Sequence, residues 1–324
     1  MRIAITGSIA TDHLMTFPGR FVEQFIPEKM DRVSLSFLVD ALEIRRGGVA
    51  ANIAFGLGVL GLSPLLIGAV GEDFAPYRTW LTGHGVDCRG VRESTTQHTA
   101  RFVCTTDADG NQIASFYPGA MSEDADIELA PLAEQAGGLD LVLIGASDPG
   151  GMLIHTRECK DLGIPFAADL SQQLPRLDPD GVRALVDGAA YLFCNEYEEA
   201  LIERKSSWSG QDILDRVGVR VTTLGPAGAK IERTGDDPVF VAAVPEVRKV
   251  DPTGTGDAFR SGFLAAVAWG LPLERAAQLG NLLAVHVLET VGTQEYELKP
   301  GALAERLGAV YGEDAAAEIA AHYS

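Results

Sequence analysis

DPTGTGD, at residues 251–257, leads directly into the apolar stretch AFRSGFL at residues 258–264. The second stretch continues as a helix, because large apolar side chains recur at four-residue spacing until Gly270-Leu271-Pro272 ends the pattern. Gly254 and Gly256 leave the backbone bare where this helix begins. The free N–H groups and the dipole of a helix N-terminus can hold a phosphoryl group. The stretch therefore predicts a glycine-rich turn that opens a helix and binds phosphate.

Asp257 lies in the first turn of this predicted helix, within reach of a hydroxyl brought up to the phosphate. Phosphoryl transfer requires positioning and charge stabilisation, with a carboxylate that orients the hydroxyl and accepts its proton. Such a base contributes about 10²- to 10⁴-fold in rate. The alternative is a glycine-containing helix cap whose aspartates only bind backbone amides.

Short apolar runs alternate with helical patterns along most of the chain. Several runs are apolar on both faces, as buried parallel strands are, and strand–helix repetition is typical of a parallel sheet covered by helices on both faces. Ligands of such sheets bind beyond the carboxyl ends of the strands. The predicted strands are 3–6, 64–67, 139–144, 166–168, 191–193 and 220–224, and the predicted helices are 50–60, 77–84, 151–162, 180–187, 197–204 and 212–217.

Two segments, 32–46 and 98–118, do not follow this alternation of strands and helices and are predicted as antiparallel strands. In the second, residues 107–111 (DADGN) form a hairpin turn with Gly110 in the left-handed position. This register places Phe102 opposite Phe116 on one face of the ribbon. Together the two segments predict a small sheet that projects from the main domain.

Other polar segments follow predicted strands. A carboxylate at Asp12, in residues 7–12, can accept two hydrogen bonds from a vicinal diol such as that of ribose, although such a residue also commonly caps a loop. Residues 46–52 (RGGVAAN) contain two adjacent glycines, and the side-chain amide of Asn52 follows four residues after the second. Asn195 and Glu198 have the spacing of a capping box, and residues 222–228 (TTLGPAG) read alone as a glycine turn.

Together and in this order, these segments resemble the PfkB (ribokinase) family of carbohydrate kinases over nearly the whole chain. Pro252 and Thr255 depart from the usual DTxGAGD pattern of the family, but the glycines and the terminal aspartate are kept. The resemblance implies a ribokinase-like three-layer α/β/α sandwich, 1–324, with a mainly parallel sheet and a small β lid from about 13–46 and 98–118. It further implies an anion hole at Gly254, Thr255 and Gly256, Asp257 as base, ATP over Asn195, Thr223, Gly225, Gly228 and Gly256, and Mg²⁺ near Asn195 and Glu198.

In detail, segments 7–12, 33–37, 98–102, 115–121 and 171–173 resemble those of mycobacterial-type adenosine kinases. This resemblance implies transfer of the ATP γ-phosphate to the 5′-hydroxyl of adenosine, giving AMP in purine salvage. Activation by a monovalent cation, for which K⁺ is the candidate, is usual in the family, and Asp251 and Thr253 are candidates to lie near such a site. The implied ribose contacts are Ser8, Asp12, Ser36, Gly48 and Asn52, and the implied purine contacts are Phe102, Phe116, Gln172 and Gln173.

The length, net charge and cysteine content of the chain bear on which ligands and which cell compartment we expect for it. With 324 residues and a formal net charge of −19, the chain predicts one large domain that binds neither nucleic acid nor an anionic membrane. The four cysteines form no CxxC pair and are predicted to be core residues. No signal peptide or membrane span is predicted, so we expect a cytoplasmic protein. An exposed lid edge can pair with another lid, which predicts a homodimer.

Three alternatives stay open at this point. The acceptor can be ribose, fructose or guanosine, or the chain can be a catalytically silent nucleoside-binding protein. The third alternative, a nicotinamide-dependent dehydrogenase, needs GxGxxG after the first strand, but residues 7–10 offer one glycine only.

Overall fold

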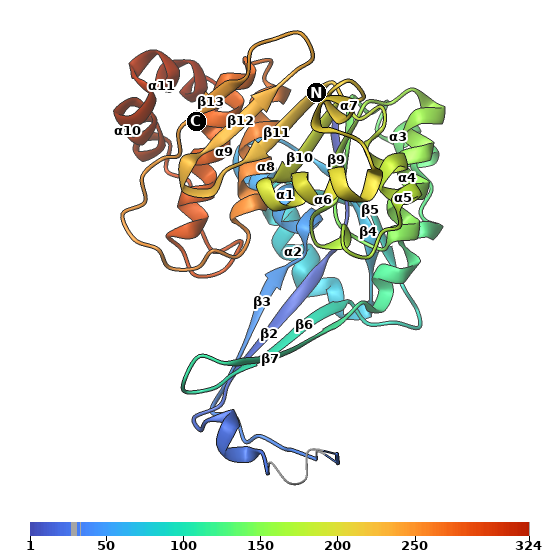
Figure 1. Ribbon diagram of the computed structural model, residues 1–324, viewed down its shortest axis with the longest axis vertical. Coiled ribbons are helices and arrows are strands. Elements are labelled where there is room, and N and C mark those ends of the chain that lie inside the picture. Colours follow the sequence, from blue (N-terminus) through green and yellow to red (C-terminus); the bar gives the residue numbers. More distant parts are fainter. Residues whose placement is uncertain (27–30, 33, 324) are drawn as a thin grey trace.

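The computed structural model describes residues 1–26, 31, 32 and 34–323 (Figure 1). A main body contains a large central sheet, and a smaller sheet projects from one side of it as a lid. No helix in this described part of the chain is long and apolar enough to cross a membrane.

The large sheet has nine strands in the order β13-β12-β11-β10-β9-β8-β1-β4-β5. Its strands are paired in parallel except where β12 joins β11 and β13. The order departs from the chain order on either side of β1, and in such sheets ligands bind at the carboxyl edge near this switch point. The strands are β1 Ile3–Thr6, β4 Leu65–Val70, β5 Asp87–Glu93, β8 Leu141–Ile144, β9 Phe166–Asp169, β10 Tyr191–Asn195, β11 Val219–Thr223, β12 Ala229–Glu232 and β13 Val239–Val241.

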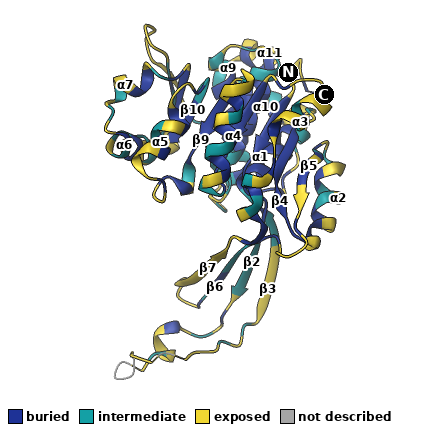
Figure 2. Cartoon of the chain, turned by 90° about the vertical axis from the view of Figure 1, so that its right-hand side faces the viewer, coloured by how far each residue is buried: buried dark blue, intermediate teal, exposed yellow. Residues whose placement is uncertain are grey.

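Helices cover both faces of this sheet, so the body has three layers (Figure 2). Successive strand residues enter different cores: Ile3 and Ile5 pack with α1, α8 and α9, whereas Ala4 packs on the side of α4 and α5. The helices are α1 Val49–Val59, α2 Ala75–Gly83, α3 Leu129–Gln135, α4 Pro149–Leu162, α5 Pro179–Val186, α6 Glu196–Ser206, α7 Gly210–Leu214, α8 Thr255–Ala268, α9 Leu273–Leu288, α10 Pro300–Tyr311 and α11 Glu313–Ala320.

The lid is a four-stranded sheet in the order β3-β2-β6-β7. The predicted hairpin is confirmed, because Phe102 pairs with Phe116 across β6 and β7, and Gly110 has a φ of +82°. The prediction of a strand from Arg32 is wrong, because β3 begins only at Ala41. In the segment before it, Phe37 packs against the rings of Phe17 and Phe21, and Val33 lies outside the described residues. The lid strands are β2 Ala10–Thr16, β3 Ala41–Gly47, β6 Ala100–Thr106 and β7 Gln112–Tyr117.

The predicted body strands and helices are all present, with ends that differ by a few residues. The three-layer fold with a lid is thus confirmed, and the four cysteines are buried and unpaired as expected. The sequence analysis did not predict β2, β5, β12, β13, α3 or α9 to α11. Strand β5 carries charged residues at several positions because it is an edge strand with one face toward solvent, so its apolar pattern is weak.

The joint between lid and body depends on Gly48, which lies between β3 and α1 with a φ of +94°. A Cβ atom added there would lie 2.5 Å from the carbonyl oxygen of Ser8 and 2.6 Å from the amide nitrogen of Ala10. Both atoms belong to the backbone and cannot rotate away. Only glycine fits this close approach between two lid strands at their roots.

We predict that Gly48→Ala lowers the free energy of unfolding by at least about 3 kcal/mol, since backbone strain and steric overlap add. Gly235→Ala is the matched control, because Gly235 has a φ of +87° but no atom within 4 Å of the added Cβ. Its cost is about 1–2 kcal/mol from the left-handed conformation alone. Urea unfolding followed by circular dichroism measures both, and equal costs would contradict the packing argument.

Candidate active site

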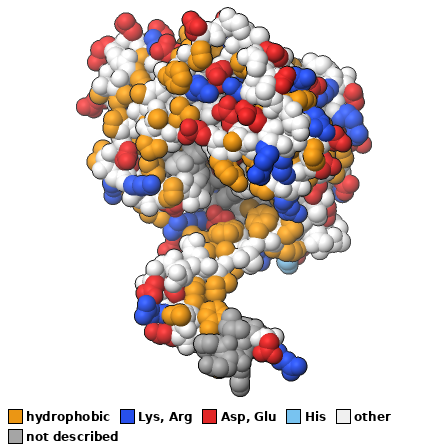
Figure 3. Space-filling view, in the orientation of Figure 1, with side chains coloured by type: hydrophobic (Ala, Val, Ile, Leu, Met, Phe, Trp, Pro, Cys, Tyr) orange, Lys and Arg blue, Asp and Glu red, His pale blue; other side chains and the backbone are white. Residues whose placement is uncertain are grey.

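A cavity of about 830 Å³ lies between the lid and the carboxyl edge of the large sheet. Figure 3 shows the hollow where the lid meets the body. Residues that directly follow β1, β9, β10 and β11 line it, as the parallel topology requires. Of the residues predicted from the sequence, the cavity brings together Ser8, Asp12, Gly48, Asn52, Phe102, Phe116, Gln172, Gln173, Asn195, Glu198, Thr223, Gly254, Thr255, Gly256 and Asp257.

Three predicted residues lie outside this lining. Ser36 is exposed in the segment between β2 and β3 and is not part of the cavity lining. Gly225 and Gly228 lie in the turn between β11 and β12, just beyond Thr223. The cavity also contains residues that the sequence analysis did not assign to the site, among them Met121, Arg176, Arg260 and Thr293.

The glycine-rich turn has the geometry of an anion hole. Gly254 precedes α8 with a φ of +78°, and α8 begins at Thr255 without a side-chain cap. The Thr255 hydroxyl donates to the carbonyl of Pro252 at 3.0 Å, which holds the turn closed. Residues 254–257 line the cavity, and the amides of Gly256 and Asp257 belong to the helix N-terminus, where the positive end of the helix dipole lies.

Asp257 lies in the first turn of α8 and accepts a hydrogen bond from the Asn52 side-chain amide at 2.8 Å. Burial raises the pKa of Asp257 to about 7, and nearby Asp169 acts in the same direction. The Asn52 hydrogen bond and the Arg260 guanidinium oppose this rise. A carboxyl with a pKa near neutrality is suited to accept a proton from a hydroxyl.

Arg260 lies one turn further along α8 and is almost fully buried. Its guanidinium pairs with Asp169 at the end of β9, with N–O distances of 2.5 and 2.7 Å. Its charge also acts on Asp257 and Glu198. The guanidinium offsets the carboxylates that surround the place where a polyphosphate would bind. The spacing of three residues from Asp257 is the signal in the sequence that could have found it.

Asp12, on β2, faces the cavity from the root of the lid. Burial raises the pKa of this carboxyl to about 6, opposed by Arg45 and supported by Asp251 and Glu295. No described residue donates a hydrogen bond to its side chain. Its two oxygens are thus available to vicinal hydroxyls of a ligand.

Aromatic and amide groups line the opposite end of the cavity. Phe102 and Phe116 lie side by side on the cavity face of the lid, and Phe116 is 47% exposed. Gln172 and Gln173 lie across from them in the short helix after β9, which spans Ser171–Gln173. A flat ring between these groups would gain stacking from one side and hydrogen bonds from the other.

Asn195 and Glu198 form the capping box of α6, with hydrogen bonds of 2.8 and 2.9 Å between each side chain and the backbone of the other. Only one Glu198 oxygen is used, so the other can hold a water of Mg²⁺ over the cavity. Magnesium keeps several of its waters and needs few protein ligands, so these residues fit it. Among the described residues there is no cluster of three acidic, histidine or cysteine side chains that would hold a metal ion by itself.

Asp251, expected near a K⁺ site, already has partners. Its carboxylate accepts the amide of Thr253 at 2.9 Å and the amide of Gly292 at 3.3 Å, and it faces Arg45 at 3.5 Å. These groups hold the pKa of Asp251 below its usual value. A cation bound there would have to share this carboxylate with Arg45.

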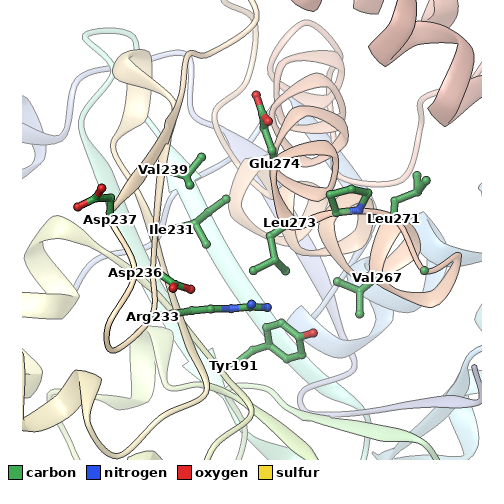
Figure 4. Close-up of a pocket in the computed structure, with 12 residues that line it drawn as sticks. Tyr191, Ile231, Arg233, Asp236, Asp237, Val239, Val267, Leu271, Leu273 and Glu274 are labelled. Carbon is green, nitrogen blue, oxygen red and sulfur yellow. The ribbon is translucent and has the colours of Figure 1, made fainter.

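A second cavity, of about 490 Å³, opens at the other end of the sheet (Figure 4). Tyr191, at the start of β10, and Arg233 point into it above an apolar floor that includes Ile231 and Leu273. It lies at the amino end of β10, away from the helix N-terminus and Asp257, so the chemistry is assigned to the first cavity.

Comparison with known proteins agrees with this geometry. The sequence signature described as pfkB family carbohydrate kinase matches residues 7–299. The chain belongs to this family. Members of the pfkB family are ATP-dependent kinases that phosphorylate sugar or nucleoside hydroxyls, which fits a cavity that joins an anion hole to a carboxylate base.

Three relatives illustrate the similarity. The nucleoside kinase of Methanocaldococcus jannaschii is 26% identical over 295 residues, covering 90% of this chain and 92% of that protein. The nucleoside kinase of Methanothermobacter thermautotrophicus is 31% identical over 269 residues, covering 82% and 85%. The structure of the Burkholderia thailandensis nucleoside kinase in complex with inosine superposes with a TM-score of 0.84 at 34% identity, covering 96% and 99%.

Proposed function

We propose that this pfkB-family protein transfers the γ-phosphate of ATP to the 5′-hydroxyl of a purine nucleoside, with adenosine as the acceptor and AMP as the product. One observation carries the proposal. A single cavity holds a free carboxylate at Asp12, an aromatic pair on the lid, and a base beside an anion hole at Asp257. A free sugar has no use for the aromatic pair. The similarity to nucleoside kinases, one of them bound to inosine, supports a nucleoside acceptor.

In this proposal the residues divide the work by position. Asp12 accepts the ribose diol, and Phe102 and Phe116 stack on the base. The 5′-hydroxyl then lies near Asp257, which accepts its proton as the oxygen attacks the γ-phosphorus and the bond to the β-phosphate oxygen breaks. The first amides of α8 stabilise the charge on the transferred group, and Arg260 offsets the nearby carboxylates. Mg²⁺ held by water at Asn195 and Glu198 would neutralise phosphate charge.

The first test is ATP consumption with Mg²⁺ against adenosine, inosine, guanosine, ribose and fructose. We expect turnover on adenosine, and we expect Asp257→Asn to lower kcat by about 10²- to 10⁴-fold because the proton acceptor is lost. The rate should rise with pH through about 7, since burial places the pKa of Asp257 there and only the ionised carboxylate accepts a proton.

The exposed Asp161→Asn variant is the matched control and should behave as the wild type. A preference for ribose or fructose would contradict the nucleoside assignment but keep the mechanism. Binding of adenosine without turnover on any acceptor would indicate a silent binding protein.

A second prediction concerns recognition of the base. Stacking on an aromatic ring is worth about 1–3 kcal/mol by alanine substitution. Phe116→Ala should therefore raise KM for adenosine roughly tenfold with a smaller change in kcat. The control is Tyr117→Ala, since Tyr117 is the next residue on β7 and points to the other face of the lid, where it donates to Gln97. An equal effect of both variants would mean general damage to the lid.

We also propose that the protein is a homodimer joined through the lid. The face opposite to Phe102 and Phe116 exposes Leu42, Ile44 and Ile113, and β7 pairs with β6 on one side and is an edge strand of the lid sheet as described here. Exposed apolar faces and open strand edges tend to pair. Light scattering should give twice the chain mass of 34.4 kDa, and Ile44→Lys should reduce it. A wild-type mass of 34.4 kDa would exclude this dimer.

A further inference from the structure

Thr293 and Gln294 lie between α9 and α10, in a segment that no motif marked. Both residues are buried, with Gln294 fully inaccessible to solvent. The methyl group of Thr293 packs against the anion-hole loop, 2.7 Å from where a Cβ on Gly254 would be. This segment therefore contacts the phosphate-binding turn without belonging to it.

The two residues fix the side-chain amide of Asn52. The Asn52 oxygen accepts the Thr293 hydroxyl at 2.9 Å and the Gln294 amide at 2.9 Å. With its oxygen held on that side, the Asn52 nitrogen is turned to Asp257, to which it donates at 2.8 Å. A flipped Asn52 would place oxygen against the carboxylate and nitrogen against two donors.

The same residues also hold the root of the lid strand β3. The Thr293 hydroxyl lies 3.0 Å from the carbonyl oxygen of Arg46, so its single proton is shared between that oxygen and Asn52. Gln294 also donates to the Tyr77 hydroxyl at 2.5 Å, and Tyr77 donates to the carbonyl of Gly47 at 3.0 Å. The Gln294 oxygen is taken by the Trp80 indole at 3.2 Å. Both N–H donors of the Gln294 side chain are thus used, and its oxygen accepts one hydrogen bond.

We propose that Thr293 and Gln294 are positioning residues that keep Asn52 donating to Asp257 and link this orientation to the position of the lid strand β3. The inference rests on the proposed function, because Asp257 must act as a base for the link to affect turnover. When the lid moves, the carbonyls of Arg46 and Gly47 move with it. The shared Thr293 proton and the Gln294–Tyr77 bond then carry that movement to Asn52.

The charged and titratable groups around Asp257 give the sign of the effect on pH dependence. Arg260 on α8 and the Asn52 amide on α1 lower the pKa of Asp257, whereas Asp169 on β9 raises it. Tyr296, two residues after Gln294, is buried, and the charge of Asp257 acts with burial to raise the pKa of its hydroxyl. Loss of the Asn52 donor therefore raises the pKa of Asp257 and moves the acid limb of the rate profile to higher pH.

The test uses Gln294→Glu, which keeps the size and the Trp80 contact but replaces the donating nitrogen by an acceptor. We expect kcat on adenosine at neutral pH to fall about 10- to 100-fold, as for small misplacements of reacting groups. KM for ATP should stay within about twofold, since this change acts through the transition state. The acid limb of the pH–rate profile should move to higher pH. Asn52→Ala combined with Gln294→Glu should be no slower than Asn52→Ala alone.

Gln278→Glu is the matched control, because Gln278 on α9 is also buried and, within the described residues, its side chain bonds to Arg275 and not to Asn52. It should leave kcat and the pH profile unchanged. If Gln294→Glu does not fold, the Thr293→Val variant tests the proposal in its place. This substitution removes the shared hydroxyl but keeps the shape of the side chain, and it should also move the acid limb of the rate profile to higher pH.

Three results would overturn the inference. One is a folded Gln294→Glu protein with an unchanged kcat and acid limb, and a second is additive losses in the double variant. An unchanged Thr293→Val profile, where Gln294→Glu cannot be studied, is the third. Absence of turnover in the wild type would overturn the proposed function and the inference together. Normal turnover in the wild type with unaffected variants would overturn the inference alone.

Discussion

The buried ion pair between Arg260 and Asp169 connects the helix that carries Asp257 to the carboxyl end of a central strand. Removing either partner would leave an uncompensated charge in the interior, which costs about 3–5 kcal/mol. The Ser171 hydroxyl adds a hydrogen bond to Asp169 at 2.6 Å, so the pair also holds the start of the segment with Gln172 and Gln173. The start of α8, Asp257 and the segment with Gln172 and Gln173 are therefore located relative to each other by this pair.

The sequence was sufficient to predict those parts of the site that local patterns determine. Residues after parallel strands meet at one edge whatever the details of packing, so Ser8, Asn195 and Thr223 could be assigned to one site from the strand pattern. The pairing of Phe102 with Phe116 was also predictable from a local pattern, because the length of a hairpin loop determines which residues face each other. Asp257 was marked by the glycines before it.

The remainder depends on contacts between distant segments. Asn52 and Gln294 are 242 residues apart, and nothing near Gln294 in the sequence indicates that its amide meets Asn52. Strand β2 was not predicted as a strand because polar residues lie on both of its faces, with Asp12 toward the cavity and Thr11 and His13 on the other side, and because its pairing with β6 is parallel, without a connecting turn to signal it. The error at Arg32 has a related cause, since the packing of Phe37 with Phe17 and Phe21 replaces strand pairing there.

The backbone passes between body and lid at four places: Gly7–Ile9, Gly48, Ser94–Thr99 and Pro118. Everything beyond these crossings belongs to one sheet and its connecting loops, while the anion hole and Asp257 stay on the other side. In the proposed reaction the lid supplies Asp12, Phe102 and Phe116 to the acceptor, whereas the anion hole lies in the body together with Gln172 and Gln173. Under this proposal, substitutions in the lid strands can change contacts to the acceptor without replacing a residue of the anion hole, so acceptor preference can diverge in part through the lid.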